Sequence, residues 1–379
     1  MKRVLILTQP LDYNYGGLLQ AFALQKIVKK IGFKVVTNKI KLKAQRKLSI
    51  NNIYNYCIIK AKEIANVIIG YNRMTPLKLK VISQNTKIFI DQYINTESIE
   101  RLTNHIINKF DIFIVGSDQV FRKQYSPVTE YFLEALKNRN DKIKFAYAAS
   151  FGTDDLSEWT QDEIKICKAL APKFKAISVR EDSGIEIFKK YFDYNVTLVL
   201  DPTLLLEKED YLETIKEEDS IIKSNILVCY ILDKTTEKKL IINRLKEKTG
   251  LELFEIMPEE TFNKNTKDIT KCIYPSVSKW LAGFRDASFV VTDSFHGMVF
   301  SIIFNKPFIC IANKERGLTR FTSLLKIFGL EDRLILLTED FSEKLLDSID
   351  YHKINDIKKE WQAKSIEFLK ENLINNESS

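Results

Sequence analysis

Short apolar runs alternate with longer stretches of helical periodicity through the first half of the chain. Leu24, Ile27, Val28 and Ile31 follow the i, i+3, i+4, i+7 spacing of an amphipathic helix, which Gly32 then ends. Strands that alternate with helices in this way favour an α/β fold with mainly parallel sheets. The predicted strands are Val4–Leu7, Lys34–Thr37, Asp111–Val115, Lys144–Ala149, Ala176–Val179 and Thr197–Leu200.

A second set of strands begins near Ile226, after a charged stretch from Glu207 to Lys223 that predicts a domain boundary. The helical pattern of Tyr351–Leu373 predicts a C-terminal helix. We therefore expect an N-terminal domain of residues 1–206, a C-terminal domain of residues 207–350, and a helix with a tail over residues 351–379, which suits the usual size of domains. The second set of predicted strands is Ile226–Ile231, Glu252–Ile256, Ser288–Thr292 and Pro307–Ile311.

Polar motifs follow four of the predicted strands at the point where each strand ends. In an open α/β sheet, ligands bind beyond the carboxyl ends of the strands. One such motif is no more than a turn, but four of them, with an Arg, a lone His and several carboxylates, predict a site in one cleft. The motifs are Gly116-Ser117-Asp118-Gln119, Arg180-Glu181-Asp182, Asp201-Pro202-Thr203 and Asp293-Ser294-Phe295-His296-Gly297.

The segment from Asn14 to Gln20 joins the first strand to the first helix and contains Gly16 and Gly17. Glycines at this place let backbone N–H groups approach a ligand, and a helix N-terminus favours an anion. A tight turn explains the pair equally well. The spacing is neither that of a dinucleotide fingerprint nor that of a P-loop, so it predicts no nucleotide site.

His296 is the strongest candidate for chemistry. A lone histidine is usually structural, but this one follows a buried strand and falls in the first turn of a helix that Asp293 or Ser294 would cap. Arg180 also follows a buried strand, where it either forms an ion pair that closes the sheet or grips a carboxylate or phosphate. The cationic loop from Asn313 to Arg320 is either solvated or part of the site.

The net charge of the chain is +8, and all of this excess lies between Lys41 and Phe110, where 12 Lys and Arg face 4 Asp and Glu. We expect residues 41–110 to be a basic helical insertion, with an amphipathic run over Ile53–Ile69. Such a run is either a solvated helical face or a surface for an anionic membrane or a lipid-linked acceptor. Nucleic acid is disfavoured because no groove-reading motif accompanies the charge.

The remaining composition is that of a soluble cytoplasmic protein. No apolar run reaches the roughly 18 residues of a spanning helix, and the apolar run after Met1-Lys2-Arg3 is too short for a secretion signal. The five cysteines show no CxxC spacing and, like the three histidines, form no metal-ligand cluster. We expect reduced core cysteines and no metal.

Taken in order, these motifs resemble those of the polysaccharide pyruvyl transferase family over roughly residues 4 to 335. Each motif is weak alone, and the ordered set is specific. One departure is Ser294, where some members of the family carry an Arg two residues before the His. The matching pieces are Asn14–Gln20, Ile114–Val120, Ala148–Gly152, Ser178–Glu181, Asp201–Thr203, Thr292–Gly297 and Asn305–Phe308.

The resemblance implies two Rossmann-like domains that face a cleft, as in the GT-B glycosyltransferases. It also implies a bacterial enzyme that uses phosphoenolpyruvate as donor substrate, without a cofactor, and forms a pyruvate ketal on a hexose. The acceptor would belong to a capsule or exopolysaccharide, or to its lipid-linked precursor. An enzyme with a lipid-linked acceptor would work in the cytoplasm and touch the inner membrane face peripherally through residues 41–110.

Such a reaction needs an acid near C3 of the donor, a base near the sugar hydroxyl, and cations for carboxylate and phosphate. We expect His296 to act as acid or base, with Asp118 and Asp293 as further catalytic candidates. Our candidates for donor binding are Arg180, Lys314, Arg316, Arg320, Ser294, Gly16 and Gly17. Our candidates for acceptor binding are Asn14, Gln20, Ser117 and Gln119.

Two other functions fit the same sequence. A glycosyltransferase of the same fold would use a nucleotide sugar and release a nucleotide instead of phosphate. A catalytically silent carbohydrate-binding protein would bind glycans without turnover, because a fold does not establish an activity.

Overall fold

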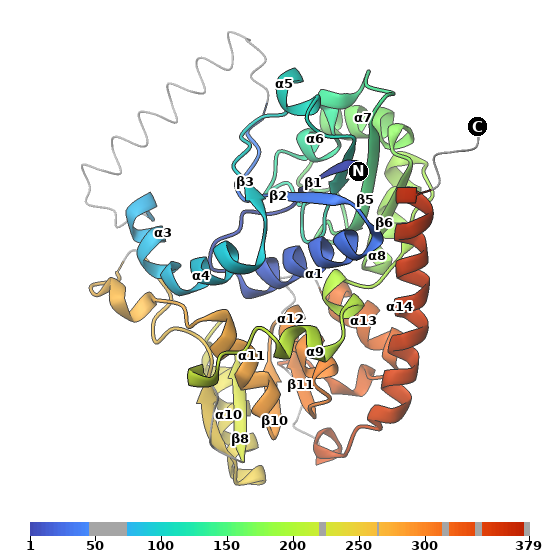
Figure 1. Cartoon of the computed structure of the whole chain (residues 1–379). Helices are drawn as coiled ribbons and strands as arrows, with labels where there is room; N and C mark the ends of the chain where they lie inside the picture. Colours follow the sequence, from blue (N-terminus) through green and yellow to red (C-terminus); the bar gives the residue numbers. More distant parts are fainter. Residues whose placement is uncertain (45–73, 220–224, 264, 313–317, 338–342, 375–379) are drawn as a thin grey trace.

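The computed structural model describes residues 1–44, 74–219, 225–263, 265–312, 318–337 and 343–374. These residues form two α/β units, drawn one above the other in Figure 1, each built on a sheet of parallel strands. The strands expected from the sequence are all present, and each begins and ends within two residues of the prediction. The α/β prediction with parallel sheets is therefore confirmed.

The N-terminal sheet has the strand order β3-β2-β1-β4-β5-β6-β7. Its central strands β1, β4 and β5 are apolar on both faces, because helices cover the sheet on both sides. The strands are β1 (Arg3–Leu7), β2 (Lys34–Asn38), β3 (Thr96–Glu97), β4 (Ile112–Val115), β5 (Ile143–Ala149), β6 (Ala176–Val179) and β7 (Thr197–Leu198). The α-helices of this part are α1 (Tyr15–Ile31), α3 (Pro76–Ile82), α4 (Gln84–Tyr93), α5 (Asn104–Ile107), α6 (Val128–Tyr131), α7 (Gln161–Leu170) and α8 (Asp182–Ile187).

The C-terminal sheet has the strand order β12-β11-β10-β8-β9. The short helix η4 (Pro202–Leu205) and α9 (Lys208–Leu212) come between the two sheets in the chain. The strands are β8 (Ile226–Tyr230), β9 (Glu252–Glu255), β10 (Phe289–Thr292), β11 (Phe308–Ile311) and β12 (Leu334–Ile335). The α-helices that follow them are α10 (Thr236–Thr249), α11 (Val277–Asp286), α12 (Phe295–Ile303), α13 (Thr319–Phe328) and α14 (Tyr351–Ile374).

Two edge strands, β3 and β12, are missing from the sequence prediction. Each has two residues, too few to show a period. β3 pairs with β2 and lies inside the segment expected to be a basic helical insertion. In the same segment, Phe89 and Ile90 of α4 are buried, and the Phe89 ring lies 5.6 Å from that of Phe22. Residues 76–97 are thus part of the N-terminal sheet and its core, while residues 45–73 lie outside the described residues.

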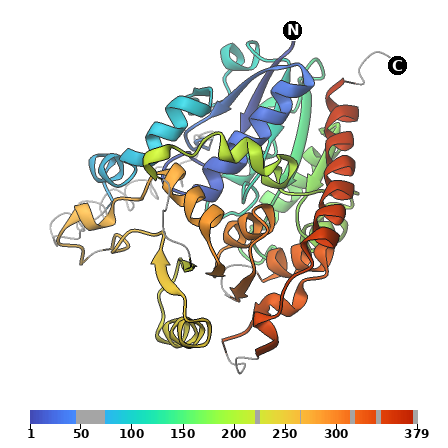
Figure 2. The ribbon, with the colours of Figure 1, turned by 60° about the horizontal axis from the view of Figure 1, so that its bottom comes forward.

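The C-terminal helix α14 runs along the side of both units (Figures 1 and 2). Near its start, the Tyr351 hydroxyl donates to the carbonyl of Lys306 in the C-terminal unit. Near its end, Ser365 Oγ accepts from Leu200 N at 3.0 Å, and the Phe368 ring lies 5.4 Å from that of Phe145. The helix therefore ties the two units together on one side.

A second connection lies where α1 meets α11. The Tyr15 ring stacks on Trp280 at 5.2 Å, and the Tyr15 hydroxyl donates to the carbonyl of Pro275 at 2.8 Å. One apolar cluster includes buried residues of both sheets on this side, such as Val4 and Val290. The start of α1 is thereby held against the C-terminal unit, next to the loop that carries the site.

Candidate active site

A cavity of about 420 Å³ opens between the two units at the carboxyl ends of β1, β4 and β8. This is the position at which open α/β sheets bind ligands. Its N-terminal wall consists of Gln9, Pro10, Asp12, Tyr13, Asn14, Asp118, Gln119 and Tyr125, and its C-terminal wall of Tyr230, Leu232, Met257, Thr261 and Tyr274.

Asn14 and Gln119 are predicted acceptor residues that line this cavity. Asn14 is the N-cap of α1, and its Oδ1 accepts from the backbone N–H of Gly17 at 3.3 Å. The Gln119 side chain accepts from Arg122 Nη1 at 2.9 Å, and its carbonyl accepts from the Gln9 amide at 2.8 Å. Gln9 and Arg122 thus hold Gln119 at the cavity wall.

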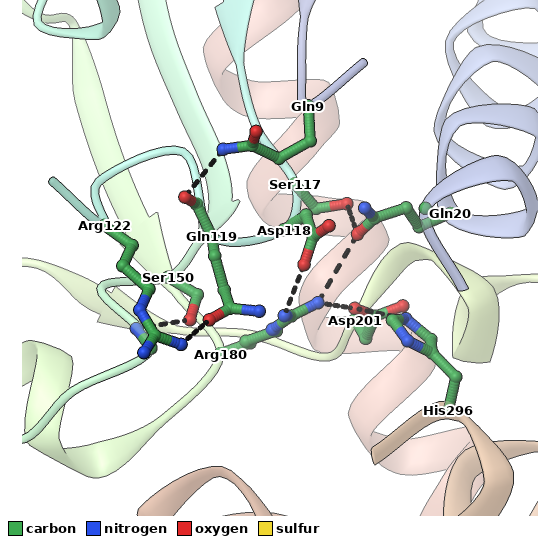
Figure 3. Close-up of polar contacts among 12 residues, drawn as sticks. Gln9, Gln20, Ser117, Asp118, Gln119, Arg122, Ser150, Arg180, Asp201 and His296 are labelled. Carbon is green, nitrogen blue, oxygen red and sulfur yellow. Dashed lines mark hydrogen bonds and ion pairs between the residues drawn. The ribbon is translucent and has the colours of Figure 1, made fainter. Parts of the chain in front are cut away.

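Behind the cavity, Arg180 is at the centre of a buried polar network (Figure 3). Its Nη2 donates to Asp118 Oδ1 at 3.1 Å and its Nη1 to Asp201 Oδ2 at 2.5 Å. The guanidinium carbon also lies 4.7 Å from the centre of the Phe295 ring. Asp118 connects the cavity with this network, because it lines the cavity and also pairs with Arg180.

Gln20 and Ser117 are predicted acceptor residues that lie in this network instead of in the cavity wall. Gln20 Oε1 accepts from Ser117 Oγ at 2.6 Å and from Arg180 Nη1 at 3.4 Å. Both side chains are buried. In this conformation their contacts position Arg180 and the end of β4.

His296 enters the network from the C-terminal unit, in the first turn of α12. Its Nε2 stands 3.7 Å from Asp201 Oδ2 and has no hydrogen-bond partner within the described part of the chain. The ring lies directly against Gly16, where a Cβ added to the glycine would stand 2.0 Å from His296 Nδ1. Gly16 is therefore required as a glycine by the close approach of an imidazole.

Asp201, the carboxylate next to His296, has a lowered pKa. Burial by itself raises the pKa of this carboxyl, but the charge of Arg180, together with His296 and the hydroxyl of Thr203, holds it well below its usual range. Thr203 contributes twice, because its N–H and its hydroxyl both donate to Asp201 Oδ1. Asp201 is thus an anion at neutral pH, fixed in orientation and next to the imidazole.

Arg320, predicted to bind the donor, is buried close to Arg180 and Glu181. Burial, followed by the charge of Arg180, lowers the pKa of Arg320 to about 10. Burial raises the pKa of Glu181, against the opposing charge of Arg180. Three arginines therefore lie near three carboxyl groups, so the cluster has no formal excess of negative charge that would repel an anion. The arginines are Arg122, Arg180 and Arg320, and the carboxyl groups are those of Asp118, Glu181 and Asp201.

The contacts of the Asp293 carboxylate are of a structural kind. Its carboxylate accepts from the N–H groups of Leu232 at 2.7 Å and Asp233 at 3.1 Å, and from Lys238 Nζ at 2.6 Å. These bonds fix the loop after β8 and occupy the oxygens that a catalytic base would need. A catalytic role for Asp293 stays a prediction that this arrangement does not favour.

Ser294 is the N-cap residue of α12, as the sequence allowed, but its side chain makes no capping hydrogen bond. It is buried, and its N–H donates to Thr292 Oγ1 at 3.1 Å. The predicted donor residues Lys314 and Arg316 lie outside the described residues.

The structure thus brings together Asp118, Arg180, His296, Gln20, Ser117 and Gly16, and it adds residues to which the sequence analysis gave no individual role. Asp201 and Glu181 belong to motifs that the sequence placed at the cleft, but neither had a predicted role. Asp12 and the tyrosines follow the first strand or come from distant segments, and no sequence pattern joins them. The added residues are Gln9, Asp12, Tyr13, Arg122, Tyr125, Glu181, Asp201, Tyr230 and Tyr274.

Among the described residues, no group of His, Cys, Asp and Glu is arranged to hold a metal ion. Cys167, Cys229, Cys272 and Cys310 are buried free thiols. No helix in the described ranges is long and apolar enough to cross a membrane.

Solved structures with similar folds have little sequence identity to this chain. Arabidopsis thaliana UGT89C1 complexed with UDP-L-rhamnose has a TM-score of 0.51 at 7% identity, over 98% of each chain. The S. aureus MnaA–UDP structure has a TM-score of 0.49 at 12% identity, over 100% of this chain and 99% of that one. UDP-GlcNAc 2-epimerase from Neisseria meningitidis, bound to UDP-GlcNAc, has a TM-score of 0.45 at 12% identity, over 96% of this chain and 100% of that one.

The likeness to the first of these structures, together with the two parallel sheets, confirms the fold expected from the sequence, two Rossmann-like domains of the GT-B type. Among curated proteins, none matches the chain. The family model of polysaccharide pyruvyl transferases matches residues 14–315, which include Gly16, the Asp118–Arg180–Asp201 network and His296. The chain therefore belongs to the polysaccharide pyruvyl transferase family.

Proposed function

We propose that this protein transfers pyruvate from phosphoenolpyruvate to a hexose of a surface polysaccharide or of its lipid-linked precursor, and forms a pyruvate ketal. The observation that carries the proposal is the meeting of His296 with Asp201 and Arg180 beside the cavity, in a chain of this family. An acid–base group and buried cations are what such a donor requires.

In the first step of this reaction, a proton adds to C3 of the donor and a sugar hydroxyl oxygen bonds to C2, while the hydroxyl proton passes to a base. The C2–O bond to phosphate then breaks, and its electron pair leaves with the phosphate. A second hydroxyl of the same sugar bonds to C2 and loses its proton, which closes the ketal. Phosphoenolpyruvate and a diol thus give a ketal and inorganic phosphate, with atoms and charge in balance.

His296 is the group we assign to protonation of C3. It lies in the first turn of α12, and its Nε2 stands 3.7 Å from Oδ2 of the Asp201 carboxylate. Nε2 is buried and makes no hydrogen bond within the described part of the chain, so this atom can turn to a bound donor. Asp201 acts here as a positioning and charge-stabilising residue.

In this proposal, Arg320 and Arg180 bind the carboxylate and phosphate groups of the donor. In the present conformation Arg180 is shared between Asp118 and Asp201, so binding to the donor would exchange one carboxylate for another anion. Arg320 is a buried cation whose pKa is lowered first by burial and then by the neighbouring charge of Arg180, so an anionic ligand would offset that charge. The N–H of Gly17, another of the predicted donor residues, already donates to Asn14 Oδ1.

The test is incubation of the purified protein with phosphoenolpyruvate and a panel of free and lipid-linked hexosides. Release of inorganic phosphate together with a gain of pyruvate mass on the sugar is expected. His296→Ala should reduce turnover about 10²- to 10⁴-fold. Near wild-type phosphate release by this variant would contradict the role of His296. Turnover of nucleotide sugars in place of phosphoenolpyruvate would favour the glycosyltransferase function instead.

We further propose peripheral contact with the inner membrane face through residues 41–110, as a lipid-linked acceptor would require. Among the described residues of this segment, Leu77 is 72% and Ile88 52% exposed. Lys78 and Lys80 lie beside Leu77 in the short helix α3, and Ile88 belongs to the next helix, α4. Exposed apolar side chains next to lysines are typical of surfaces that adsorb to anionic membranes.

A further inference from the structure

The reaction proposed above needs a base at the sugar hydroxyl, and the two carboxylates predicted for this role are already neutralised. Asp118 pairs with Arg180 at 3.1 Å, and Asp293 pairs with Lys238 at 2.6 Å. The oxygens of a carboxylate that is held by a cation are already engaged and are less available to a substrate hydroxyl. The cavity contains a different candidate.

Asp12 lines the cavity from the loop between β1 and α1. Its Oδ1 accepts from the Tyr13 N–H at 2.6 Å, and its carbonyl accepts from Thr86 Oγ1 of α4 at 2.6 Å. These bonds hold the loop and the carboxylate in one orientation. No cation among the described residues forms an ion pair with it, in contrast to Asp118 and Asp293.

The electrostatic environment of Asp12 suits proton transfer. Burial raises the pKa of its carboxyl above the ordinary value, against the lowering effect of the backbone N–H groups of Tyr13 and Asn14. A carboxylate with a raised pKa takes up a proton more readily than an ordinary one. Raised carboxyl pKa values are also common at functional sites.

The walls around Asp12 have the chemistry of a sugar-binding site. The Tyr13 and Tyr274 rings lie 4.7 Å apart and are tilted by 30°, so they form one aromatic patch in the lining of the cavity that also contains Asp12. Asn14 and Gln119 add amide groups on the same N-terminal wall as Asp12 and Tyr13. Aromatic surfaces with a few convergent polar groups are typical of small-molecule pockets, and about 420 Å³ is within their usual range.

We propose that Asp12 is the general base that removes the proton from the attacking hydroxyl of a hexose bound against Tyr13 and Tyr274. The inference rests on the proposed function. The hydroxyl proton passes to the Asp12 carboxylate while the oxygen bonds to C2 of the donor. The proton on Asp12 then passes to the departing phosphate or to solvent, so the residue is regenerated.

The titratable groups that face Asp12 are few. On α4, which holds the Asp12 carbonyl, Lys87 and Asp91 pair with each other at the surface. Beyond η6 (Ile269–Cys272), Tyr274 contributes a phenol, and Lys271 of η6 lies 3.7 Å from Glu260. The remaining titratable groups of the cavity wall are Tyr13, Asp118, Tyr125 and Tyr230. The phenols ordinarily titrate near pH 10, so an acidic limb of the pH profile would report a carboxylate of the cavity, and Asp12→Asn tests whether that carboxylate is Asp12.

The test compares the full-length wild type with Asp12→Asn, since asparagine keeps the oxygen that accepts from Tyr13 N. We expect kcat/KM for the hexoside to fall about 10²- to 10⁴-fold, with the affinity for phosphoenolpyruvate and the Tm unchanged. The acidic limb of the wild-type pH profile should disappear. Asp91→Asn, a surface carboxylate on α4, is the matched control and should retain full activity.

The outcomes separate the inference from the function on which it rests. If the wild type releases phosphate and Asp12→Asn stays within about threefold of it with the same acidic limb, Asp12 is not the base and the proposed function stands. If Asp12→Asn loses affinity for phosphoenolpyruvate instead of turnover, Asp12 belongs to the donor site and the inference is wrong. If the wild type never releases phosphate with any hexoside, both the function and the base are refuted.

Discussion

Gly16 lies directly against His296, and Gly16→Ala is expected to displace the imidazole without disrupting the fold. A Cβ at this position would stand 2.0 Å from Nδ1, 2.4 Å from Cγ and 2.6 Å from Cε1 of His296. Since ordinary contacts begin at 3.4 Å, the ring would have to retreat by about 1 Å or more. A displacement of about 1 Å in a catalytic group costs on the order of 10²-fold in rate.

The stability effect has two opposing parts. Alanine in place of glycine gains up to about 1 kcal/mol of helix propensity, because residue 16 lies inside α1. Overpacking against a buried ring costs about 1–3 kcal/mol. The variant should therefore be between neutral and about 2 kcal/mol less stable than the wild type, while kcat falls about 100-fold.

A double-mutant cycle with His296→Ala isolates the contact. Without the imidazole, Gly16→Ala should become stabilising by up to about 1 kcal/mol in urea unfolding, so the coupling free energy should reach about 1–3 kcal/mol. Gly17→Ala serves as the reference for helix propensity, since its Cβ would stand 3.5 Å from the Asn14 side chain, an ordinary contact.

Equal effects of Gly16→Ala on stability in both backgrounds would refute the proposed contact. Full activity of the single variant would show that the ring can move by about 1 Å without consequence, and His296 would then lose its assignment as the acid.

Three other predictions follow from the network and the basic segment. Asp201→Asn should lower stability at pH 7, since the folded-state pKa of this carboxyl is depressed. The difference from the wild type should persist down to the unfolded pKa of about 3.9 and shrink as pH falls further, and an increase towards acid pH would contradict the ion pair. Arg180→Lys should weaken donor affinity, because an ammonium cannot bridge two groups as a guanidinium does; an unchanged donor titration with weaker acceptor binding would assign Arg180 to the sugar side or to structure. Replacing Lys41 and Lys43, with the two basic residues that follow them, by Gln should reduce sedimentation with anionic vesicles at low salt and spare activity on a soluble acceptor, and a wild type that ignores such vesicles would exclude the membrane contact.

The sequence by itself determined the fold class, the main strands and the family. Central strands such as Ile112–Val115 and Phe289–Thr292 are buried on both faces, so they stand out in the sequence as short continuous apolar runs. Polar motifs at the ends of such strands meet at one edge of a sheet, and this rule alone places Asp118, Arg180 and Asp201 near one another. The edge strands β3 and β12 were missed because two residues carry no period.

Only the tertiary structure decided which of the polar side chains are held in ion pairs and which line the cavity without one among the described residues. Asp293 and Asp118 look alike in sequence, yet both are held by cations that come from distant segments, Lys238 and Arg180. The approach of His296 to Gly16 joins residues from opposite units, and the cavity around Asp12 needs walls from both. Ion pairing and burial depend on which distant residues come within a few ångströms of a side chain in the folded protein. Local sequence patterns do not determine those distances.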